Sequence, residues 1–127
     1  MSLMPKPEFT VSIVARYLPE QSDPEQQAYA FAYHVTIVNT GDVAAQLIGR
    51  RWLITDSAGA AQEVRGLGVV GHQPMLQPGE QFEYQSWARL AAPRGRMEGS
   101  FFCMTHDAHS FEAPIAAIEL SQQSVLH

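Results

Sequence analysis

Short segments in which every second residue is apolar recur along the whole chain, and this pattern constrains the fold most strongly. Residues 9–17, FTVSIVARY, and residues 28–39, AYAFAYHVTIVN, both alternate in this way and are rich in β-branched and aromatic residues. Such alternation is typical of β-strands, and no stretch shows the 3.6-residue apolar period with end caps that indicates a helix. The pattern predicts seven strands, at residues 9–17, 28–39, 45–56, 61–66, 80–90, 97–105 and 110–120.

Turn signals close most of these segments. The sequences NTGD (39–42), DSAG (56–59) and QPGE (77–80) place Gly, Pro, Asn or Asp where tight turns need them. Short strands joined by tight turns predict an all-β fold, an antiparallel immunoglobulin or fibronectin type III-like β-sandwich of about seven strands, with a small barrel as the alternative. The polar segment 19–27, which Pro24 interrupts, is expected to be a surface connection.

Length and composition limit the function classes. The 127 residues are expected to form one domain at 9–127, with 1–8 as an extended or disordered N-terminus whose first three residues resemble a cloning remnant. The net charge is −5 with eight Lys and Arg residues, so nucleic-acid binding is not expected. No apolar run reaches the ~18 residues that span a bilayer, and the N-terminal segment lacks the apolar core of a signal peptide. The single cysteine, Cys103, cannot form an internal disulfide. We expect a cytoplasmic protein that does not bind membranes.

A glycine motif stands out in the stretch VRGLGVVGHQP. Gly66, Gly68 and Gly71 have the G-x-G-x-x-G spacing of a dinucleotide-binding loop, but that loop needs a helix directly behind it to hold the pyrophosphate. Here Pro74 and Pro78 follow and exclude an ordinary helix. We therefore expect the three glycines to permit positive φ angles or close backbone approach in a long loop between the sheets.

An alternative function is open at the same loop. The backbone amides of Gly66, Gly68 and Gly71 could form an anion-binding concavity without a helix, and Arg65 directly before them could add positive charge. Such a site would bind pyrophosphate or a nucleotide.

Clusters that could carry catalysis or bind a metal are sparse. The sequence HDAH offers His106, Asp107 and His109, but zinc or cobalt needs three or four converging donors, so we expect exposed turn residues and no metal site. Cys103 shares its strand face with Phe101 and is predicted to face the core, where a thiol stays protonated and inert. No nucleophile with an adjacent base, no paired-acid motif and no cofactor lysine is recognisable. We assign no catalytic residues and no cofactor, and do not expect an enzyme.

The aromatic residues divide between core and surface. Trp52 is expected to be the core tryptophan of a central strand, with Arg50 on the same face if the strand is regular. Because a buried unpaired arginine is costly, either a bulge resets the alternation or Arg50 lies at the edge with a carboxylate partner. Trp87 and Phe102 have outward parity on two strands interpreted as hairpin neighbours, so both should lie on one outer sheet face. They are expected to form an interaction surface or to be covered by a loop or the C-terminal tail.

The run RRWLITDSAGAAQEVRGLGVVGHQPMLQPGEQFEY, followed by PRGRMEGSF, FEAPI and a final VLH, resembles the ApaG family of bacteria from about Phe9 onward. The resemblance implies a fibronectin type III-like sandwich. It also implies an interaction module, since similar domains occur in an F-box protein and in a DNA polymerase δ-interacting protein. The family is linked genetically to cobalt resistance and magnesium efflux, without an established molecular activity. Leu67, His72, Trp87 and Phe102 depart from the family's usual pattern.

Two function hypotheses follow. The first is a non-enzymatic binding domain that presents the glycine loop and an outer sheet face to an unidentified protein partner, or to another copy of itself in a homo-oligomer. The alternative is the small-anion site at residues 66–71.

Overall fold

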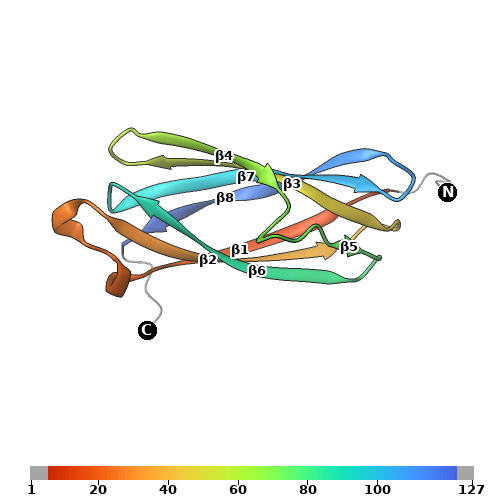
Figure 1. Cartoon of the computed structure of the whole chain (residues 1–127), viewed down its shortest axis with the longest axis horizontal. Helices are drawn as coiled ribbons and strands as arrows, with labels where there is room; N and C mark the ends of the chain where they lie inside the picture. The colour runs from red at the N-terminus through yellow and green to blue at the C-terminus, as the bar shows by residue number, and fades with distance from the viewer. Residues whose placement is uncertain (1–5, 123–127) are drawn as a thin grey trace.

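The computed structural model describes residues 6–122, which form two antiparallel β-sheets packed face to face (Figure 1). The first sheet has the order β1-β2-β6, with β1 at Phe9–Tyr17, β2 at Tyr29–Asn39 and β6 at Gln81–Leu90. The second sheet has the order β4-β3-β7-β8, with β3 at Ala45–Asp56, β4 at Ala61–Leu67, β7 at Arg94–Thr105 and β8 at Ser110–Ser121. A two-residue strand, β5 at Met75–Leu76, also pairs with β3.

This architecture confirms the predicted all-β sandwich, and each of the seven predicted strands is present. The sequence pattern does not predict β5, because two residues carry no periodicity. The predicted connection at 19–27 forms two exposed single-turn 3-10 segments, Pro19–Gln21 and Pro24–Gln26, and residues 6–122 contain no α-helix. In particular, no helix begins behind the glycine motif.

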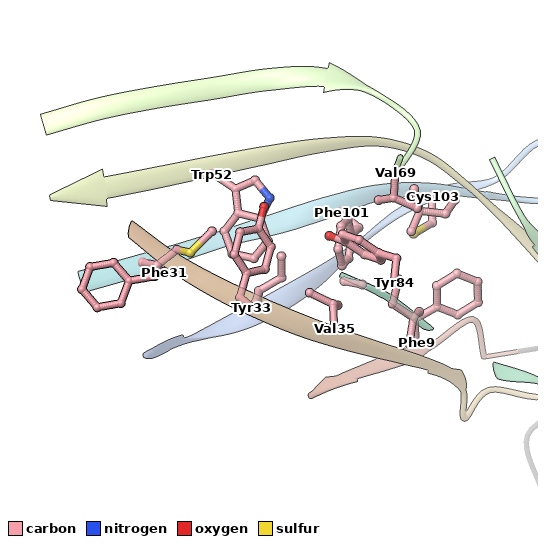
Figure 2. Packing of buried hydrophobic residues seen from close by; sticks show 14 of the residues in the cluster. Phe9, Phe31, Tyr33, Val35, Trp52, Val69, Tyr84, Phe101 and Cys103 are labelled. Atoms are coloured by element: carbon pink, nitrogen blue, oxygen red, sulfur yellow. The ribbon is translucent and has the colours of Figure 1, made fainter. Parts of the chain in front are cut away.

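Alternate residues of both sheets meet in one principal apolar core (Figure 2). Trp52 of β3 is 2% exposed, which confirms its core position. Its ring packs edge-on against Tyr33 of β2 at a centroid distance of 5.5 Å and against Phe101 of β7 at 6.3 Å. Such aromatic pairs contribute about 0.5–1.5 kcal/mol each beyond the area they bury. Cys103 is also fully buried, as predicted, and burial raises the pKa of its thiol from 9.0 to about 12.

The link between β6 and β7 crosses from one sheet to the other. β6 pairs with β2, whereas β7 pairs with β3 and β8. The prediction that these strands are hairpin neighbours is therefore wrong, and Trp87 and Phe102 lie on the outer faces of opposite sheets. The linking sequence APRGR contains Pro93 and lacks the Asn-Gly or Asp-Gly pair that fixes a two-residue hairpin, so its turn chemistry did not specify pairing.

One buried polar side chain joins the end of β2 to β5. Asn39 is 1% exposed, and its Nδ2 donates to the carbonyls of Val43 at 3.0 Å and Leu76 at 2.9 Å. Its Oδ1 accepts from the amide of Gly41 at 3.0 Å. The side-chain amide therefore satisfies three backbone groups. It lies where β2 of the first sheet leads into β3 of the second, and where β5 leads back into β6 of the first.

Candidate functional site

The three glycines of the G-x-G-x-x-G stretch meet three different steric requirements. Gly66 lies in β4, and a Cβ atom there would lie 2.8 Å from Nη1 of Arg50. Gly68 has a φ of +66°, and a Cβ there would lie 2.5 Å from the carbonyl oxygen of His72. Gly71 has a φ of +81° in the turn that follows. These conformations confirm that the glycines permit positive φ or close approach, although the group approaching Gly66 is a side chain.

Several amides of this loop are hydrogen-bonded within the chain. The amide of Gly68 donates to the carbonyl of Ile48 at 2.8 Å. Val69 and His72 exchange two backbone hydrogen bonds, of 2.8 and 2.9 Å, around a tight turn whose central residues are Val70 and Gly71. Among residues 6–122, neither central amide of that turn has a protein acceptor. The loop geometry is thus accounted for by internal pairing, and its binding of pyrophosphate or nucleotides stays a prediction.

Arg65, the predicted cationic partner of the loop, points to the outer face of its sheet. Its Nε donates to the carboxylate of Glu63, and Arg51 Nη2 reaches the second oxygen of the same carboxylate at 3.3 Å. The hydrogen bond from Arg65 lowers the pKa of Glu63, with Arg51 adding to the effect. The structure therefore places the Arg65 guanidinium against Glu63 on the exposed face.

Arg50, rather than Arg65, is the arginine whose guanidinium contacts the glycine motif. A bulge between Leu47 and Gly49 does interrupt β3, but it precedes Arg50 and leaves it opposite Phe101, on the same inward-facing side as Trp52. The expected carboxylate partner is absent among residues 6–122. Instead, Nη1 donates to the carbonyl of Leu67 at 3.1 Å and to that of Gly68 at 2.8 Å. The guanidinium lies over Gly66, so the first glycine of the motif makes room for an arginine of the neighbouring strand.

Beside Arg50, a cleft of about 550 Å³ lies between the β4 and β6 sides of the two sheets. Its lining includes Tyr33, Arg50, Trp52 and Ser86. Trp52 Nε1 and the hydroxyl of Tyr84 are buried and have no hydrogen-bond partner within residues 6–122. Burial raises the pKa of the Tyr84 hydroxyl well above its ordinary value, with Tyr33 adding to the rise and Arg50 opposing it. The hydroxyl is therefore neutral at physiological pH.

A second hollow, of about 600 Å³, lies on the outer face of the β4-β3-β7-β8 sheet. Leu67, Gly49, Phe102 and Glu112 form one row across four neighbouring strands. Leu67 is 78% exposed and Phe102 is 43% exposed, with no side chain on Gly49 between them. Trp87 is 58% exposed on the opposite sheet. The exposure of both predicted surface aromatics is confirmed, whereas their common face is not.

The HDAH segment forms the turn between β7 and β8. The carboxylate of Asp107 accepts from the Thr105 hydroxyl and lies 3.3 Å from His109 Nδ1, and these two contacts lower its pKa. Asp107 and His109 are both exposed, as expected for turn residues. Within residues 6–122, no three His, Cys, Asp or Glu side chains are grouped closely enough to hold a metal ion.

Comparison with known proteins agrees with this architecture. The family model described as "ApaG domain" matches residues 19–105. The chain belongs to the ApaG family. It is 56% identical over 124 residues to Protein ApaG of Ralstonia nicotianae, covering 98% of this chain and 100% of that protein. It is 52% identical over 127 residues to Protein ApaG of Aromatoleum aromaticum, with both chains fully covered.

A crystal structure of a Bordetella pertussis protein named ApaA superposes on this ApaG-family chain with a TM-score of 0.88 and 54% identity, covering 91% of this chain and 94% of the other. These similarities support the sandwich and the family assignment. No helix among residues 6–122 is long and apolar enough to cross a membrane.

The cleft residues of this ApaG-family chain were largely missed by sequence reasoning. Tyr33 and Trp52, which line the cleft, and the nearby Tyr84 each match the apolar face of a strand, and that pattern predicts core packing rather than a polar role. The one available signal was Arg50, a charged residue with core parity beside a tryptophan. A charge in that position requires a specific partner or access to a polar cavity.

Proposed function

We propose that the chain is a non-enzymatic binding domain that holds a protein partner on the outer face of the β4-β3-β7-β8 sheet. One observation carries the proposal: Leu67 and Phe102 are exposed on either side of Gly49, in register across three adjacent strands. Large exposed apolar side chains around a hollow mark contact surfaces, and a single inserted side chain can dominate the binding energy. The hollow over Gly49 suits an apolar anchor from the partner.

The charge around the hollow indicates what should flank that anchor. Three arginines, at positions 50, 51 and 65, line it together with one carboxylate, that of Glu112. Arg51 and Arg65 also share Glu63, so one carboxylate serves two guanidinium groups. A surplus of positive charge in a chain of net charge −5 favours a partner segment with acidic residues beside its apolar anchor.

The same charge argues against a symmetric dimer through this face. A two-fold interface brings identical patches together, so the arginines of one copy would face those of the other. A different protein is therefore the preferred partner, with self-association through another face as the competing outcome. A role in cobalt resistance or magnesium efflux would then act through that partner.

The test is a Leu67→Ser, Phe102→Ser double variant, with Trp87→Ser on the opposite sheet as the matched control. Both should retain the stability of the parent within about 0.5 kcal/mol, because exposed positions contribute little to folding. Cross-linking in cells of the native host identifies the partner, and titration with that purified protein gives the affinity. We expect the double variant to bind at least tenfold more weakly and Trp87→Ser to bind normally.

If Trp87→Ser binds the partner more weakly and the double variant binds normally, the partner binds the β1-β2-β6 sheet and the proposal is wrong. Sedimentation velocity of the same proteins reports self-association. A dimer abolished by Leu67→Ser, Phe102→Ser would show that the charge argument against a symmetric interface is wrong.

A further inference from the structure

We propose that the cleft between the β4 and β6 sides of the sandwich binds a small molecule through an oxyanion, a phosphate or carboxylate group, held by Arg50, Trp52 and the hydroxyl of Tyr33. Of the residues that line this cleft and the hollow on the proposed protein-binding face, only Arg50 is common to both within residues 6–122. Trp52 and Tyr84 face inward between the sheets, whereas Leu67 and Phe102 face outward. Either proposal can fail without the other.

The region around the cleft has an excess of hydrogen-bond donors. The indole N–H of Trp52 is a donor only, lies in a side chain that is 2% exposed, and has no acceptor within residues 6–122. Arg50 offers five N–H groups, of which only those on Nη1 bond protein acceptors in that range. The Tyr84 hydroxyl is unpaired as well. The indole and guanidinium groups are donors only and cannot satisfy one another, and buried polar groups are rarely left unpaired, so this cluster calls for an acceptor.

These groups converge on one region between the sheets. Tyr33 packs against Trp52 with a ring centroid distance of 5.5 Å, and both line the cleft. The Tyr84 hydroxyl points back toward both rings in Figure 2. Tyr84 and Arg50 each adjoin Phe101, the first by ring contact at 6.5 Å and the second by strand pairing. Tyr33 of β2 and Arg50 and Trp52 of β3 thus line one space. Tyr84 of β6 is close enough to Tyr33 and Arg50 to interact with both electrostatically.

The charge of the cleft selects an anion. Arg50 and Arg89 are in its lining, and no Asp or Glu among residues 6–122 is. This is notable in a chain with 13 acidic and eight basic residues. Guanidinium groups beside neutral N–H and O–H donors recognise carboxylate and phosphate oxygens.

The position of Arg50 is itself built into the fold. Any side chain at Gly66 would overlap the guanidinium, since a Cβ atom would lie 2.8 Å from Nη1 and 2.9 Å from Cζ. The carbonyls of Leu67 and Gly68 then hold Nη1. This anchoring fixes the charged group before a ligand arrives, which reduces the entropy cost of binding.

The walls of the cleft suggest the rest of the ligand. Ile54, Val64 and Leu90 contribute apolar surface, and the volume of about 550 Å³ is within the usual range for small-molecule sites. A ligand with a small apolar or aromatic body and one oxyanion fits this combination. Phenyl phosphate and benzoate are the probes that carry these two features, and inorganic phosphate tests the oxyanion alone.

The experiment is a titration of the full chain with phenyl phosphate, benzoate and inorganic phosphate, each against sodium chloride at equal ionic strength. Binding is followed by ¹H–¹⁵N NMR of the tryptophan indole groups, and a Trp87→Phe variant assigns the two signals. We expect a saturable shift of the Trp52 indole signal at millimolar ligand. The tighter of phenyl phosphate and benzoate identifies the preferred oxyanion. If no probe shifts that signal saturably, the proposal is wrong and solvent satisfies the donors.

Variants locate the site. Arg50→Gln should weaken binding roughly tenfold or more, because a hydrogen bond between charged groups is lost. Gly66→Ala should weaken binding to a similar extent without changing the net charge of the protein. Its methyl group would displace the Arg50 guanidinium, which can move because it is the end of a flexible side chain. Arg65→Gln is the matched control on the outer face and should bind as the parent does.

Two outcomes would overturn the assignment. Loss of binding in Arg65→Gln with retention in Arg50→Gln would place the anion on the outer side of the glycine loop. If Arg50→Gln fails to fold, Trp52→Phe and Tyr33→Phe replace it, since each keeps an aromatic ring and removes one donor from the cleft lining. Binding to Trp52→Phe is followed by the backbone amide signals, because this variant lacks the reporter indole. Unchanged affinity in both of these variants would equally exclude the cleft.

Discussion

Replacing Tyr84 with phenylalanine should make the unliganded protein more stable. The hydroxyl is buried without a partner in residues 6–122, and an unsatisfied buried polar group costs about 1–3 kcal/mol. Removing it leaves a void of roughly 15 Å³, which at about 24 cal/mol per Å³ costs about 0.4 kcal/mol. The ring contacts with Phe82 and Phe101 are kept. The free energy of unfolding should therefore rise by about 1 kcal/mol.

Urea denaturation measures this change as a shift of the transition midpoint with an unchanged m-value. Tyr33→Phe is the matched control, because Tyr33 lines the open cleft, where its hydroxyl can bond water. That variant should stay within about 0.5 kcal/mol of the parent. If Tyr84→Phe is instead destabilised by 1 kcal/mol or more, its hydroxyl is hydrogen-bonded in solution. That result would contradict the absence of a hydrogen-bond partner for the Tyr84 hydroxyl within residues 6–122.

Three further predictions test the rest of the structure. Val70→Asn should raise stability by about 1 kcal/mol in thermal unfolding, because Val70 is exposed and has a φ of +49°, a conformation that costs a β-branched residue more than asparagine; a loss would show that the turn differs in solution. Asn39→Ala should lower stability by about 2–3 kcal/mol in urea, since the carbonyls of Val43 and Leu76 lose their buried donor; a neutral result would contradict that role. The raised thiol pKa of Cys103 favours its neutral form in the folded state, so its contribution to stability is complete below pH 9 and is lost between pH 9 and about 12, by about 1.4 kcal/mol per pH unit. Cys103→Ala should remove that part of the alkaline slope in pH-dependent unfolding, and an unaltered slope would show that the thiol is accessible.

The β-sandwich could be predicted because the features that indicate strands and turns are found in short segments of the sequence. Period-two alternation in the strands and Gly, Pro and Asn in the turns indicate where strands begin and end, and alternation also placed Cys103 and Trp52 inside. The pairing between strands was less accessible. The short link at 91–93 leads from β6 into a different sheet, and which neighbour an edge strand selects depends on packing across the whole core.

The candidate sites show the same division. Exposure of Trp87 and Phe102 follows from strand parity alone, yet their placement on opposite sheets needs the topology. The hollow over Gly49 depends on register, since only the pairing of β4, β3 and β7 reveals that Leu67 and Phe102 flank a residue without a side chain. The bulge before Gly49 sets that register, and nothing in the local sequence specifies it.

The G-x-G-x-x-G spacing is accounted for here without reference to a nucleotide. Gly66 accommodates the Arg50 guanidinium, Gly68 allows the close approach of the His72 carbonyl, and Gly71 completes a turn that requires positive φ. Gly66 and Gly68 are constrained by different neighbours and Gly71 by its own backbone conformation, so the spacing reflects three independent constraints. The first of them matters most for function, because it fixes a cation at the mouth of a cleft that otherwise offers unpaired donors. A motif that resembles a phosphate loop can thus contribute to anion binding indirectly, through the arginine that its first glycine admits.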